Sequence, residues 1–504
     1  MSTIPSSPGP LILALDIGSS SVRAQFFTAR GAALPTPTAH IPIQLRTTPD
    51  GGSEIDVDVL LTAIWRCVDR IVEEAGDLTE RIAGVASCTF VTNLVGVDAD
   101  GRPVTPLTTY ADTRAAQEAA ALRAELDPAA IHARTGCYLH TSYLPARLRW
   151  YARTQPERCS RVAQWRSLGA HMEAQLFGAA AVSFSAASWS GLLNRRTLTW
   201  DDELLAALPI QKHQLSALKD VDAPRRGLRA PFAQRWPALR DVPWFPAVGD
   251  GAAANLGSGC ATPARVALTV GTTGAVRIVA PGAPAEIPAG LWCYRVDRER
   301  SLVGGALSGG GNIYAWLRET LQLEDNDPAQ VEAALAEMAP DAHGLTVLPF
   351  WAGERSPGWA DDARATLHGL SLATTPVALL RASLEAVAYR IGLIFERLRP
   401  LLPADAQVVV SGVALPASPT WMQITSDVLG RPLIISQVEE ASARGAALLA
   451  LEALGLRESS TSENETNLVI DGERITPHPA HHEIYQAAMA RQQALYQRLG
   501  DFRN

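Results

Sequence analysis

The sequence predicts an α/β protein built by duplication from two similar domains. A chain of 504 residues is too long for one hydrophobic core, and two domains of about 250 residues each are the expected division. A seven-residue phrase, ALDIGSS, begins at Ala14 and returns 253 positions later at Ala267 as ALTVGTT. Strand-like and helix-like apolar patterns alternate in both halves. We therefore expect one domain over residues 1–254 and a second over 255–504.

Each copy of the repeated phrase predicts a turn that binds phosphate. An apolar strand leads to a glycine, Gly18 or Gly271, and small hydroxyl residues follow it. Glycine tolerates positive φ and a close backbone approach, and consecutive N–H groups with Ser or Thr hydroxyls form a concave anion site. An ordinary Gly-Ser hairpin would also fit one such phrase. The recurrence favours two turns that hold a polyphosphate from opposite sides.

Composition narrows the class of protein. With a net charge of −8, the chain shows nothing that favours a nucleic acid or an anionic membrane as partner. Six scattered cysteines without a C-x-x-C pair suit reduced thiols, and they argue against a zinc site or a disulfide framework. The segment from Met1 to Pro10 has the composition of a loose tail and not of a signal peptide. No apolar run is long enough to span a membrane, so we expect a soluble, cytoplasmic protein.

Apolar periodicity predicts the order of helices and strands. In the first half we expect strands at 11–17, 22–28, 39–45, 82–88, 93–98 and 246–248, a helix over 57–75 and a helix-rich stretch over 113–178. In the second half we expect strands at 301–304, 407–411 and 432–436, helices through Trp316 and over 376–399, 420–429, 441–454 and 482–500, and a polar, mobile loop over 457–466. In the helix over 376–399, Thr375 is a suitable N-cap, and the apolar residues follow a single face.

Seven segments resemble the FGGY family of carbohydrate kinases, and the resemblance extends from Leu11 to the C-terminal helix. In chain order they are LDIGSSSVRA (15–24), TTYADTRAA (108–116), GDGAAANLGSG (249–259), TVGTTGAVR (269–277), GGALSGGGNIYAWL (304–317), LPFWAGERSP (348–357) and SGVALPASPTWMQITSDVLGRPL (411–433). The resemblance implies a duplicated actin/hexokinase-like (ribonuclease H-like) fold with an interdomain cleft. It also implies transfer of the γ-phosphoryl group of ATP to a hydroxyl of a sugar, polyol or sugar acid, with ATP and Mg²⁺ as cofactors. A homodimer is compatible with it.

Asp250 is the candidate catalytic base. It lies between two glycines at a strand end, before a run of alanines, so we expect its carboxylate at a helix N-terminus beside the domain junction. A carboxylate within hydrogen-bond reach of the acceptor hydroxyl can orient it and take its proton. A plain helix N-cap is the other interpretation of an Asp at this place. The resemblance favours the catalytic role.

The first turn supplies the candidate metal ligand and phosphate contacts. The family's Asp near the metal of MgATP corresponds to Asp16, and Mg²⁺ is satisfied by one or two carboxylates with retained waters. A turn-capping Asp is the alternative. By the same resemblance, the residues that face the phosphates are Ser19, Ser20, Ser21 and Arg23 in the first half and Thr272 and Thr273 in the second. The direction of Arg23 depends on strand register, so a solvated strand residue is equally compatible.

Two further segments are the candidate nucleotide site. Gly311 corresponds to the family's glycine beside the nucleotide, at the start of a helix whose free N–H groups favour anions. After the strand at 407–411 the family usually has two consecutive glycines, whereas this chain has Gly412 followed by Val413. A β-branched residue does not easily take positive φ, and its side chain would crowd a ligand. We therefore expect an altered turn, a lowered affinity for the nucleotide or an impaired protein.

The acceptor contacts differ from those common in the family. Xylulose and gluconate kinases commonly carry Gln-Met-His after the strand at 82–88, and here that place is held by Val91, Thr92 and Asn93. The segment with Asp112 and Arg114 resembles the version of gluconate-kinase-like members. An Arg there pairs with a sugar-acid carboxylate or forms a salt bridge within its own helix. Further candidates are Tyr143 and Trp189, for packing on the sugar or in the core, and Glu354 and Arg355, for bracing the cleft or pairing together.

The sequence therefore favours an ATP-dependent kinase of a sugar or sugar acid, with a gluconate-like acceptor preferred. A kinase of xylulose, another ketopentose or a polyol is the alternative within the class. Outside the class, a catalytically impaired, nucleotide-dependent sugar-binding protein would have the same fold. Val413 and the absent His favour that third interpretation, and Asp250 with the two turns opposes it.

Overall fold

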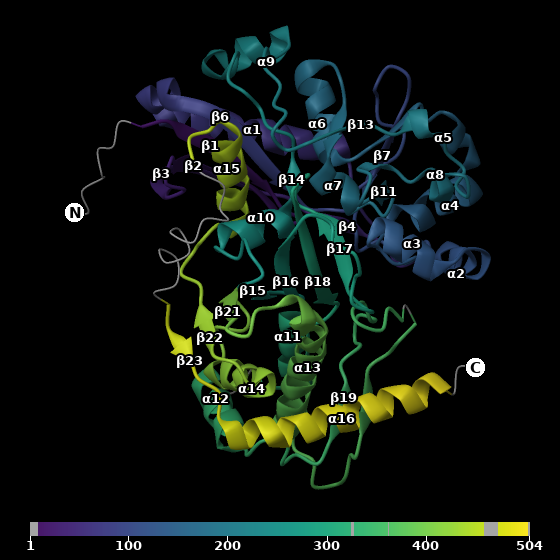
Figure 1. Cartoon of the computed structure of the whole chain (residues 1–504), viewed down its shortest axis with the longest axis vertical. Helices are drawn as coiled ribbons and strands as arrows, with labels where there is room; N and C mark the ends of the chain where they lie inside the picture. Colours follow the sequence, from purple (N-terminus) through teal and green to yellow (C-terminus); the bar gives the residue numbers. More distant parts are fainter. Residues whose placement is uncertain (1–8, 324–326, 361, 458–471, 502–504) are drawn as a thin grey trace.

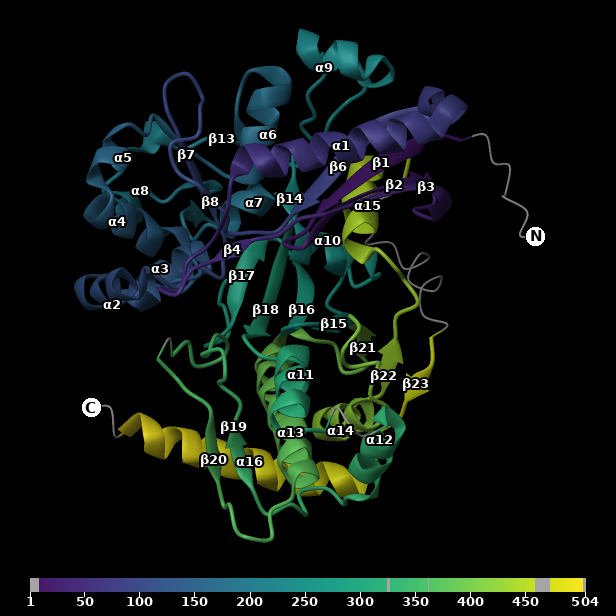
Figure 2. The ribbon, with the colours of Figure 1, turned by 180° about the vertical axis from the view of Figure 1, so that it is seen from behind.

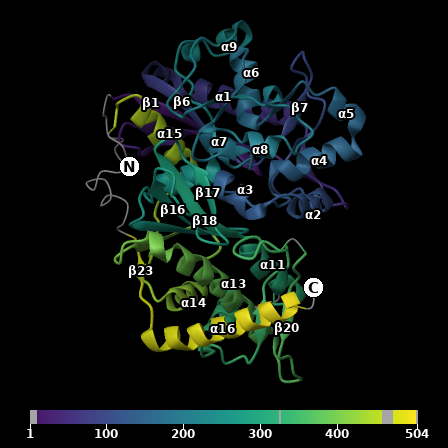
Figure 3. The ribbon, with the colours of Figure 1, turned by 45° about the vertical axis from the view of Figure 1, so that its right-hand side comes forward.

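The computed structural model describes residues 9–323, 327–360, 362–457 and 472–501. Two β-sheets lie one above the other, each flanked by helices (Figure 1). The first half of the chain forms one sheet and the second half the other, and Figure 3 shows the two parts stacked along the long axis. The sequence predicts a boundary after residue 254, which lies inside the helix that joins the two parts, Asp250–Gly257.

The five-stranded sheet of the first half has the order β14-β6-β1-β2-β3. Its strands are β1 (Leu11–Ile17), β2 (Ser21–Thr28), β3 (Ala33–Pro42), β6 (Ile82–Thr89) and β14 (Val248–Gly249). β1 pairs antiparallel with β2 and parallel with β6, and β14 pairs parallel with β6. Because β1, β6 and β14 run in one direction, their carboxyl ends share one edge of the sheet.

The seven-stranded sheet of the second half has the order β17-β18-β16-β15-β21-β22-β23. Its strands are β15 (Arg265–Val270), β16 (Gly274–Pro281), β17 (Trp292–Arg295), β18 (Arg300–Leu307), β21 (Gln407–Ser411), β22 (Leu433–Ile435) and β23 (Arg474–Ile475). Its inner run β22-β21-β15-β16-β18 repeats the order and the strand directions of β14-β6-β1-β2-β3. The duplication predicted from the repeated phrase is confirmed.

Helices cover both faces of the first sheet. α1 (Val57–Ala75) begins after Asp56, whose carboxylate caps it, and packs on β2 and β3. α15 (Ala441–Ala453), from the second half of the chain, lies against β1 and β6 on the opposite face (Figure 2). β1 is buried because it is covered on both sides, which explains its nearly continuous apolar run.

α10 (Asp250–Gly257) and α15 pack against each other where the two halves of the chain meet. A Cβ atom on Gly445 would lie 1.8 Å from the carbonyl oxygen of Ala253, and one on Gly257 would lie 1.8 Å from that of Ala441. The two backbones approach closely because both helices have glycine at the crossing. This crossing holds the N-terminus of α10, and therefore Asp250, in place.

α13 (Pro376–Leu398) confirms the predicted cap and corrects the predicted face. The hydroxyl of Thr375 accepts a hydrogen bond from the backbone N–H of Ala378 at 3.2 Å. The expectation of a single apolar face is wrong, because the helix is buried on nearly all sides. It packs against β16, β18 and β19 and also against α11, α12, α14 and α16. Its buried charged residues are each paired in this packing: Arg381 with Glu385, and Arg390 with Glu354.

The remaining elements connect and surround the two sheets. The helices are α2 (Ala116–Glu125), α3 (Pro128–Thr135), α4 (Leu144–Thr154), α5 (Pro156–Ser160), α6 (Leu168–Phe177), α7 (Phe184–Ser188), α8 (Asp202–Leu205), α9 (Ala230–Arg235), α11 (Gly311–Thr320), α12 (Pro328–Glu337), α14 (Pro419–Leu429) and α16 (Pro479–Asp501), with 3₁₀ turns η1 (Gly76–Arg81), η2 (Lys212–Gln214), η3 (Pro237–Leu239) and η4 (Arg399–Leu401). The short strands are β4 (Arg46–Thr47), β5 (Ser53–Ile55), β7 (Val95–Val97), β8 (Leu107–Thr108), β9 (Gln164–Arg166), β10 (Ala181–Ser183), β11 (Leu193–Asn194), β12 (Thr199–Trp200), β13 (Ala217–Lys219), β19 (Thr346–Leu348) and β20 (Thr366–His368).

The described residues test some of the predictions made from composition. All six cysteines are free thiols, as expected. Within the described ranges, no helix has both the length and the apolar character needed to cross a membrane. Most of the predicted N-terminal tail (residues 1–8) and most of the predicted polar loop (from residue 458) lie outside the described residues.

Candidate active site

Asp250 lies at the edge where the parallel strands of the first sheet end. β14 ends at Gly249, which is the N-cap of α10, and Asp250 is the first residue of that helix. Asp250 is therefore not the N-cap that the alternative interpretation assumed. Its Oδ1 accepts a hydrogen bond from the N–H of Gly251 at 2.7 Å. Burial, together with the nearby charge of Asp16, raises the pKa of Asp250 to about 7.

Asp16 comes close to Asp250 through the pairing of β1, β6 and β14. Asp16 lies opposite Cys88 in β6, and Cys88 lies opposite Val248 in β14. The thiol of Cys88 donates to Oδ1 of Asp16 at 3.2 Å. Burial raises the pKa of Asp16, and the charge of Glu440 raises it further. A carboxylate held among like charges fits a divalent cation, because the cation would relieve both effects.

A cavity of about 270 Å³ opens beside Asp250 and receives residues from both halves of the chain. From the first half, its lining includes Val91, Thr92, Tyr110, Ser142, Tyr143, Trp189, Asp250, Gly251 and Ala254. From the second half, it includes Thr273, Gly274, Ala275, Arg277, Trp292, Tyr294, Ala306, Arg355, Trp359 and Ser442. The predicted residues Val91, Thr92, Tyr143 and Trp189 are therefore brought together with Asp250, and so is Thr273 of the second turn.

Aromatic rings form part of this lining. Trp189 stacks on Tyr294 with ring centroids 3.7 Å apart, and Trp292 stacks on the same tyrosine at 4.4 Å, with the two tryptophan rings 5.5 Å apart. The hydroxyls of Tyr143 and Tyr294 lie 2.5 Å apart. Trp292 and Tyr294 come from β17 of the second sheet, so the cavity lining depends on the packing of the two halves.

Two arginines also line the cavity. Arg277 donates to Thr269 Oγ1 at 2.9 Å and to the carbonyl of Gly251 at 3.4 Å. Arg355 donates to the carbonyl of Leu307 at 2.5 Å. Neither guanidinium has a carboxylate partner within the described parts of the chain, and burial lowers the pKa of both. The cavity lining thus contains two cationic groups and one carboxyl group, that of Asp250.

Some lining groups have unused hydrogen-bonding capacity. Thr92 Oγ1 and the indole N–H of Trp189 are buried without a hydrogen-bond partner among the described residues. Buried polar groups are normally paired, so these two are available to an acceptor hydroxyl. Asn93 is different: its side chain is buried, and it accepts from the N–H of Leu168 at 2.7 Å and donates to the carbonyl of Phe90. Its amide is occupied within the protein.

The first predicted phosphate turn joins β1 to β2. Neither Gly18 nor Gly271 uses the positive φ that glycine permits. The N–H of Gly18 donates to the carbonyl of Ser21 at 2.9 Å, which closes an ordinary tight hairpin. Among its hydroxyl residues, Ser20 is exposed and Ser19 is half-buried, whereas Ser21 is buried in the strand. Arg23 points toward α15, where its Nη1 lies 2.9 Å from an oxygen of Glu440.

The second turn is joined to the start of α11. The N–H of Gly311 donates to the carbonyl of Gly271 at 2.8 Å, and the N–H of Asn312 donates to that of Thr272 at 3.2 Å. The expectation of free N–H groups at Gly311 is therefore wrong in this conformation, because the turn uses them. Thr272 is exposed, while Thr273 is half-buried in the cavity lining.

Gly412 and Val413 follow β21. Gly412 has a φ of +86°, and a Cβ atom there would lie 2.6 Å from the carbonyl oxygen of Val270, so glycine is needed. Val413 does not have positive φ, and its side chain is 81% exposed. The expected conflict between valine and the backbone is thus absent. Val413 remains a predicted nucleotide contact that faces solvent.

Asp112 and Arg114 do not line the cavity. Arg114 pairs with Asp112 at 2.5 Å and with Glu54 at 2.8 Å, and its guanidinium lies over the ring of Trp150. Asp112 also accepts from the N–H groups of Ser53 and Arg114. Both side chains hold the loop before α2 against β5, which satisfies their charges. Of the pair Glu354 and Arg355, only Arg355 reaches the cavity, and Glu354 instead pairs with Arg390 and Tyr496.

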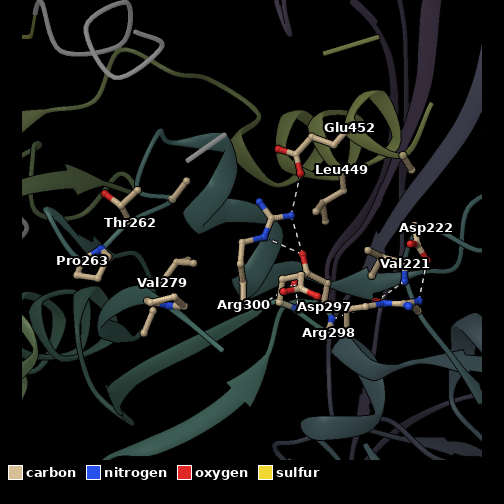
Figure 4. A pocket seen from close by; sticks show the side chains of 16 residues that line it. Val221, Asp222, Thr262, Pro263, Val279, Asp297, Arg298, Arg300, Leu449 and Glu452 are labelled. Carbon is tan, nitrogen blue, oxygen red and sulfur yellow. Dashed lines mark hydrogen bonds and ion pairs between the residues drawn. The ribbon is translucent and has the colours of Figure 1, made fainter. Parts of the chain in front are cut away.

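A larger cavity, of about 680 Å³, lies apart from Asp250 beside α15 and the start of β18. Its arginines are used within the protein (Figure 4): Arg300 pairs with Asp297 and Glu452, and Arg298 pairs with Asp220 and Asp222. The smaller cavity at Asp250 has the groups that a phosphoryl transfer needs: a carboxyl that can take a proton and cations that can face phosphate.

The actin-like ATPases have this fold, in which two duplicated domains each contain a mixed sheet and a carboxylate lies where the two domains meet. Two models of the FGGY family of carbohydrate kinases match the chain, that of its N-terminal domain over residues 11–257 and that of its C-terminal domain over 266–454. The chain therefore belongs to the FGGY family, whose members are phosphotransferases with an alcohol group as acceptor.

Three relatives illustrate the range of similarity. The gluconokinase of Bacillus subtilis (strain 168) is 26% identical over 454 residues, which are 88% of each chain. A xylulose kinase structure from Rhodospirillum rubrum is 27% identical with a TM-score of 0.87, and the match covers 98% of this chain and 99% of that one. A gluconate kinase structure from Lactobacillus acidophilus has the same TM-score at 23% identity, covers 98% and 99%, and supports the fold alone.

Sequence reasoning missed part of the cavity lining, namely Tyr110, Trp292, Tyr294 and Trp359. Tyr110 lies inside a segment that carried the resemblance, so its motif was a usable signal. Trp292 and Tyr294 lie on one strand at spacing two, which indicates a shared face but not which face meets the other domain.

Proposed function

We propose that this kinase phosphorylates a sugar acid, with a gluconate-like acceptor preferred. The observation that supports the proposal is Arg355, a half-buried residue whose side chain lines the cavity without a carboxylate partner among the described residues. Burying a cation is costly unless an anion accompanies it, so a carboxylate on the acceptor would complete the site. The likeness to gluconokinase is consistent with this choice.

In the proposed reaction, Asp250 accepts the proton of the acceptor hydroxyl as its oxygen forms the bond to the γ-phosphorus of ATP. The bond from that phosphorus to the oxygen of ADP breaks, and ADP leaves with this electron pair. Kinases of this family use ATP. Mg²⁺, held at Asp16, would supply charge neutralisation of the phosphates. Ser19, Ser20, Thr272 and Thr273 would face the phosphates, and Gly311, Gly412 and Val413 the adenosine.

Thr92 and Trp189 are proposed as hydrogen-bond donors to acceptor hydroxyls, since both have polar groups at the cavity that no described residue pairs. The stacked rings of Trp189 and Tyr294 offer an apolar surface for the carbon face of a sugar. A ketopentose would also use these groups, and the similarity to a xylulose kinase structure keeps that acceptor as the second candidate. The six free thiols suit a reducing cytoplasm.

The proposal is tested by coupled ADP release with a panel of aldonic acids, ketopentoses and polyols. We expect the highest kcat/KM with an aldonic acid. A preference for a ketopentose or polyol would contradict the acceptor class but not the reaction. Absence of ADP release with any acceptor, while ATP-Mg²⁺ still raises the Tm, would support the impaired sugar-binding protein instead.

Arg355→Gln should raise the KM for an aldonic acid by about 10- to 100-fold, because a charge-assisted pair worth about 1.5–3 kcal/mol is lost. The KM for a neutral acceptor such as xylulose should change far less. Both constants are measured on the same preparation, so general damage to the fold would affect both. An equal change for the two acceptors would show that Arg355 does not contact a carboxylate.

A further inference from the structure

Three side chains of the second half meet at the end of α14, distant in the fold from Asp250. Asp427 is in the last turn of α14, His478 immediately precedes α16, and His481 is in the first turn of α16. One oxygen or nitrogen atom from each lies within 4.8 Å of the others. In the sequence, His478 and His481 have the H-x-x-H spacing, which is a possible metal-binding signal besides the cysteines.

Two distances within this Asp427-His478-His481 cluster are close to those between neighbouring ligands on one metal ion. His478 Nδ1 lies 3.3 Å from Asp427 Oδ1, and His481 Nδ1 lies 2.9 Å from Oδ2. Zinc binds imidazole nitrogen and carboxylate oxygen at about 2.0–2.2 Å, so two tetrahedral ligands are about 3.3 Å apart. Hydrogen-bonded His–Asp pairs would have the same two contacts, so an experiment must distinguish a metal site from such pairs.

The carboxylate is held in place by two further hydrogen bonds, one from Gln423 and one from the backbone of His478. Asp427 is only 1% exposed, and its Oδ1 accepts from Gln423 Nε2 at 2.8 Å and from the backbone N–H of His478 at 2.7 Å. Pro477 and Pro479 flank His478 and restrict its backbone. Such outer hydrogen bonds orient metal ligands in proteins. Both histidines remain partly exposed, so an ion could enter from solvent.

A second group of possible metal ligands, Asp341, His343 and Glu385, lacks these properties. Glu385 accepts from Arg381 at 2.7 Å and from Tyr389 at 2.9 Å, and it also contacts His343 at 3.0 Å. Its neighbour Asp341 pairs with Arg491 at 2.5 Å. Two guanidinium groups already neutralise these carboxylates and would repel a cation. In the Asp427-His478-His481 cluster, no arginine or lysine pairs with the carboxylate of Asp427 in the described structure.

We propose that Asp427, His478 and His481 bind a zinc ion. The protein supplies three ligands, and the fourth position is open to solvent or to a ligand. A cavity of about 500 Å³ adjoins the site and is lined by Asp427 and His481 together with Gln423, Thr420, Met338 and Tyr485. Because α14 packs against α16, the ion ties the C-terminal helix to the domain. Its binding therefore stabilises the folded protein.

The test uses zinc binding by the whole chain, measured by calorimetry without nucleotide, and the Tm with and without ZnCl₂. The variants are His478→Asn and His481→Asn, with His482→Asn as matched control. His482 lies in the same helical turn, but its Nδ1 bonds the backbone carbonyl of Asp427 at 2.8 Å and not the carboxylate. We expect one zinc per chain in the wild type and the control, with a raised Tm. In the two ligand variants the Kd should rise at least about 100-fold.

Co²⁺ provides an independent readout, since a four-coordinate site gives it a strong visible absorption that loosely bound, six-coordinate Co²⁺ lacks. This absorption should appear with the wild type and His482→Asn and be lost in both ligand variants. Zinc affinity that is equal in all four proteins would overturn the proposal, as would a wild type that binds no zinc. Either result would mean that the cluster consists of hydrogen-bonded pairs.

Discussion

Asp250→Asn should lower kcat at least about 100-fold, which is the low end of the effect expected for a positioned proton acceptor. The amide has nearly the same shape as the carboxylate, and its oxygen can still accept the N–H of Gly251, so α10 should begin at the same residue. The variant cannot take the proton of the acceptor hydroxyl. Steady-state kinetics with saturating ATP and acceptor measure the loss. Turnover within a few-fold of wild type would remove Asp250 from the mechanism.

The pH dependence of stability provides the fold control for this variant. Burial raises the pKa of Asp250 to about 7, above the ordinary value of 3.8 for an unperturbed Asp. Between these values the folded protein binds more protons than the unfolded chain, so this carboxyl lowers stability as the pH rises from about 4 to 7. The variant has no titrating carboxyl at position 250, so it does not lose stability in this way as the pH rises. In the absence of Mg²⁺ and nucleotide, its Tm relative to wild type should therefore be higher at pH 8 than at pH 5. A constant difference would contradict the raised pKa.

Gly445→Ala should destabilise the protein by about 3 kcal/mol or more and reduce activity with it. The new Cβ would lie 1.8 Å from the carbonyl oxygen of Ala253, whereas ordinary contact begins at 3.4 Å. Backbone cannot rotate away as a side chain does, so α10 must move relative to α15. That movement displaces Asp250, and a misplacement of about 1 Å can cost about 100-fold in rate. Thermal unfolding and kcat measure the two effects.

Gly392→Ala is the matched control for this change. Gly392 is also within a helix, but a Cβ there would meet only side-chain atoms, Val428 Cγ1 at 3.0 Å and Met489 Sδ at 3.2 Å. These can adjust, and alanine favours the helix by about 1 kcal/mol, so we expect little net change in stability. If both substitutions had the same small effect, the close crossing of α10 and α15 would not be important for stability.

Much of the architecture could be predicted because it depends on local patterns. The apolar run at 11–17 and the helical spacing at 57–75 match β1 and α1, and the repeated phrase correctly predicted two equivalent hairpins. The pattern around Asp250 predicted a strand end followed by a helix start, which the structure has. These features depend on side-chain periodicity and short-range turn chemistry, which the linear order of residues contains.

Other features of the site could not be predicted, because they depend on pairing between distant segments. Register turns Arg23 toward Glu440, 417 residues later in the chain. The N–H groups of Gly311 and Asn312 are used by carbonyls of the second turn, which lies 40 residues earlier in the chain. In both cases a contact with another segment of the chain decided how the groups of the local motif are used.

By itself, the sequence determined the duplicated α/β class, the order of the elements and the position of one acidic residue at the junction. Only the tertiary structure decided which charges meet. It left Arg355 without a carboxylate partner among the described residues, paired Arg114 elsewhere, and brought Asp427 to two histidines at the start of a distant helix. The reason is physical: apolar periodicity specifies which face of an element is buried, whereas the partner of a buried charge depends on which elements pack together.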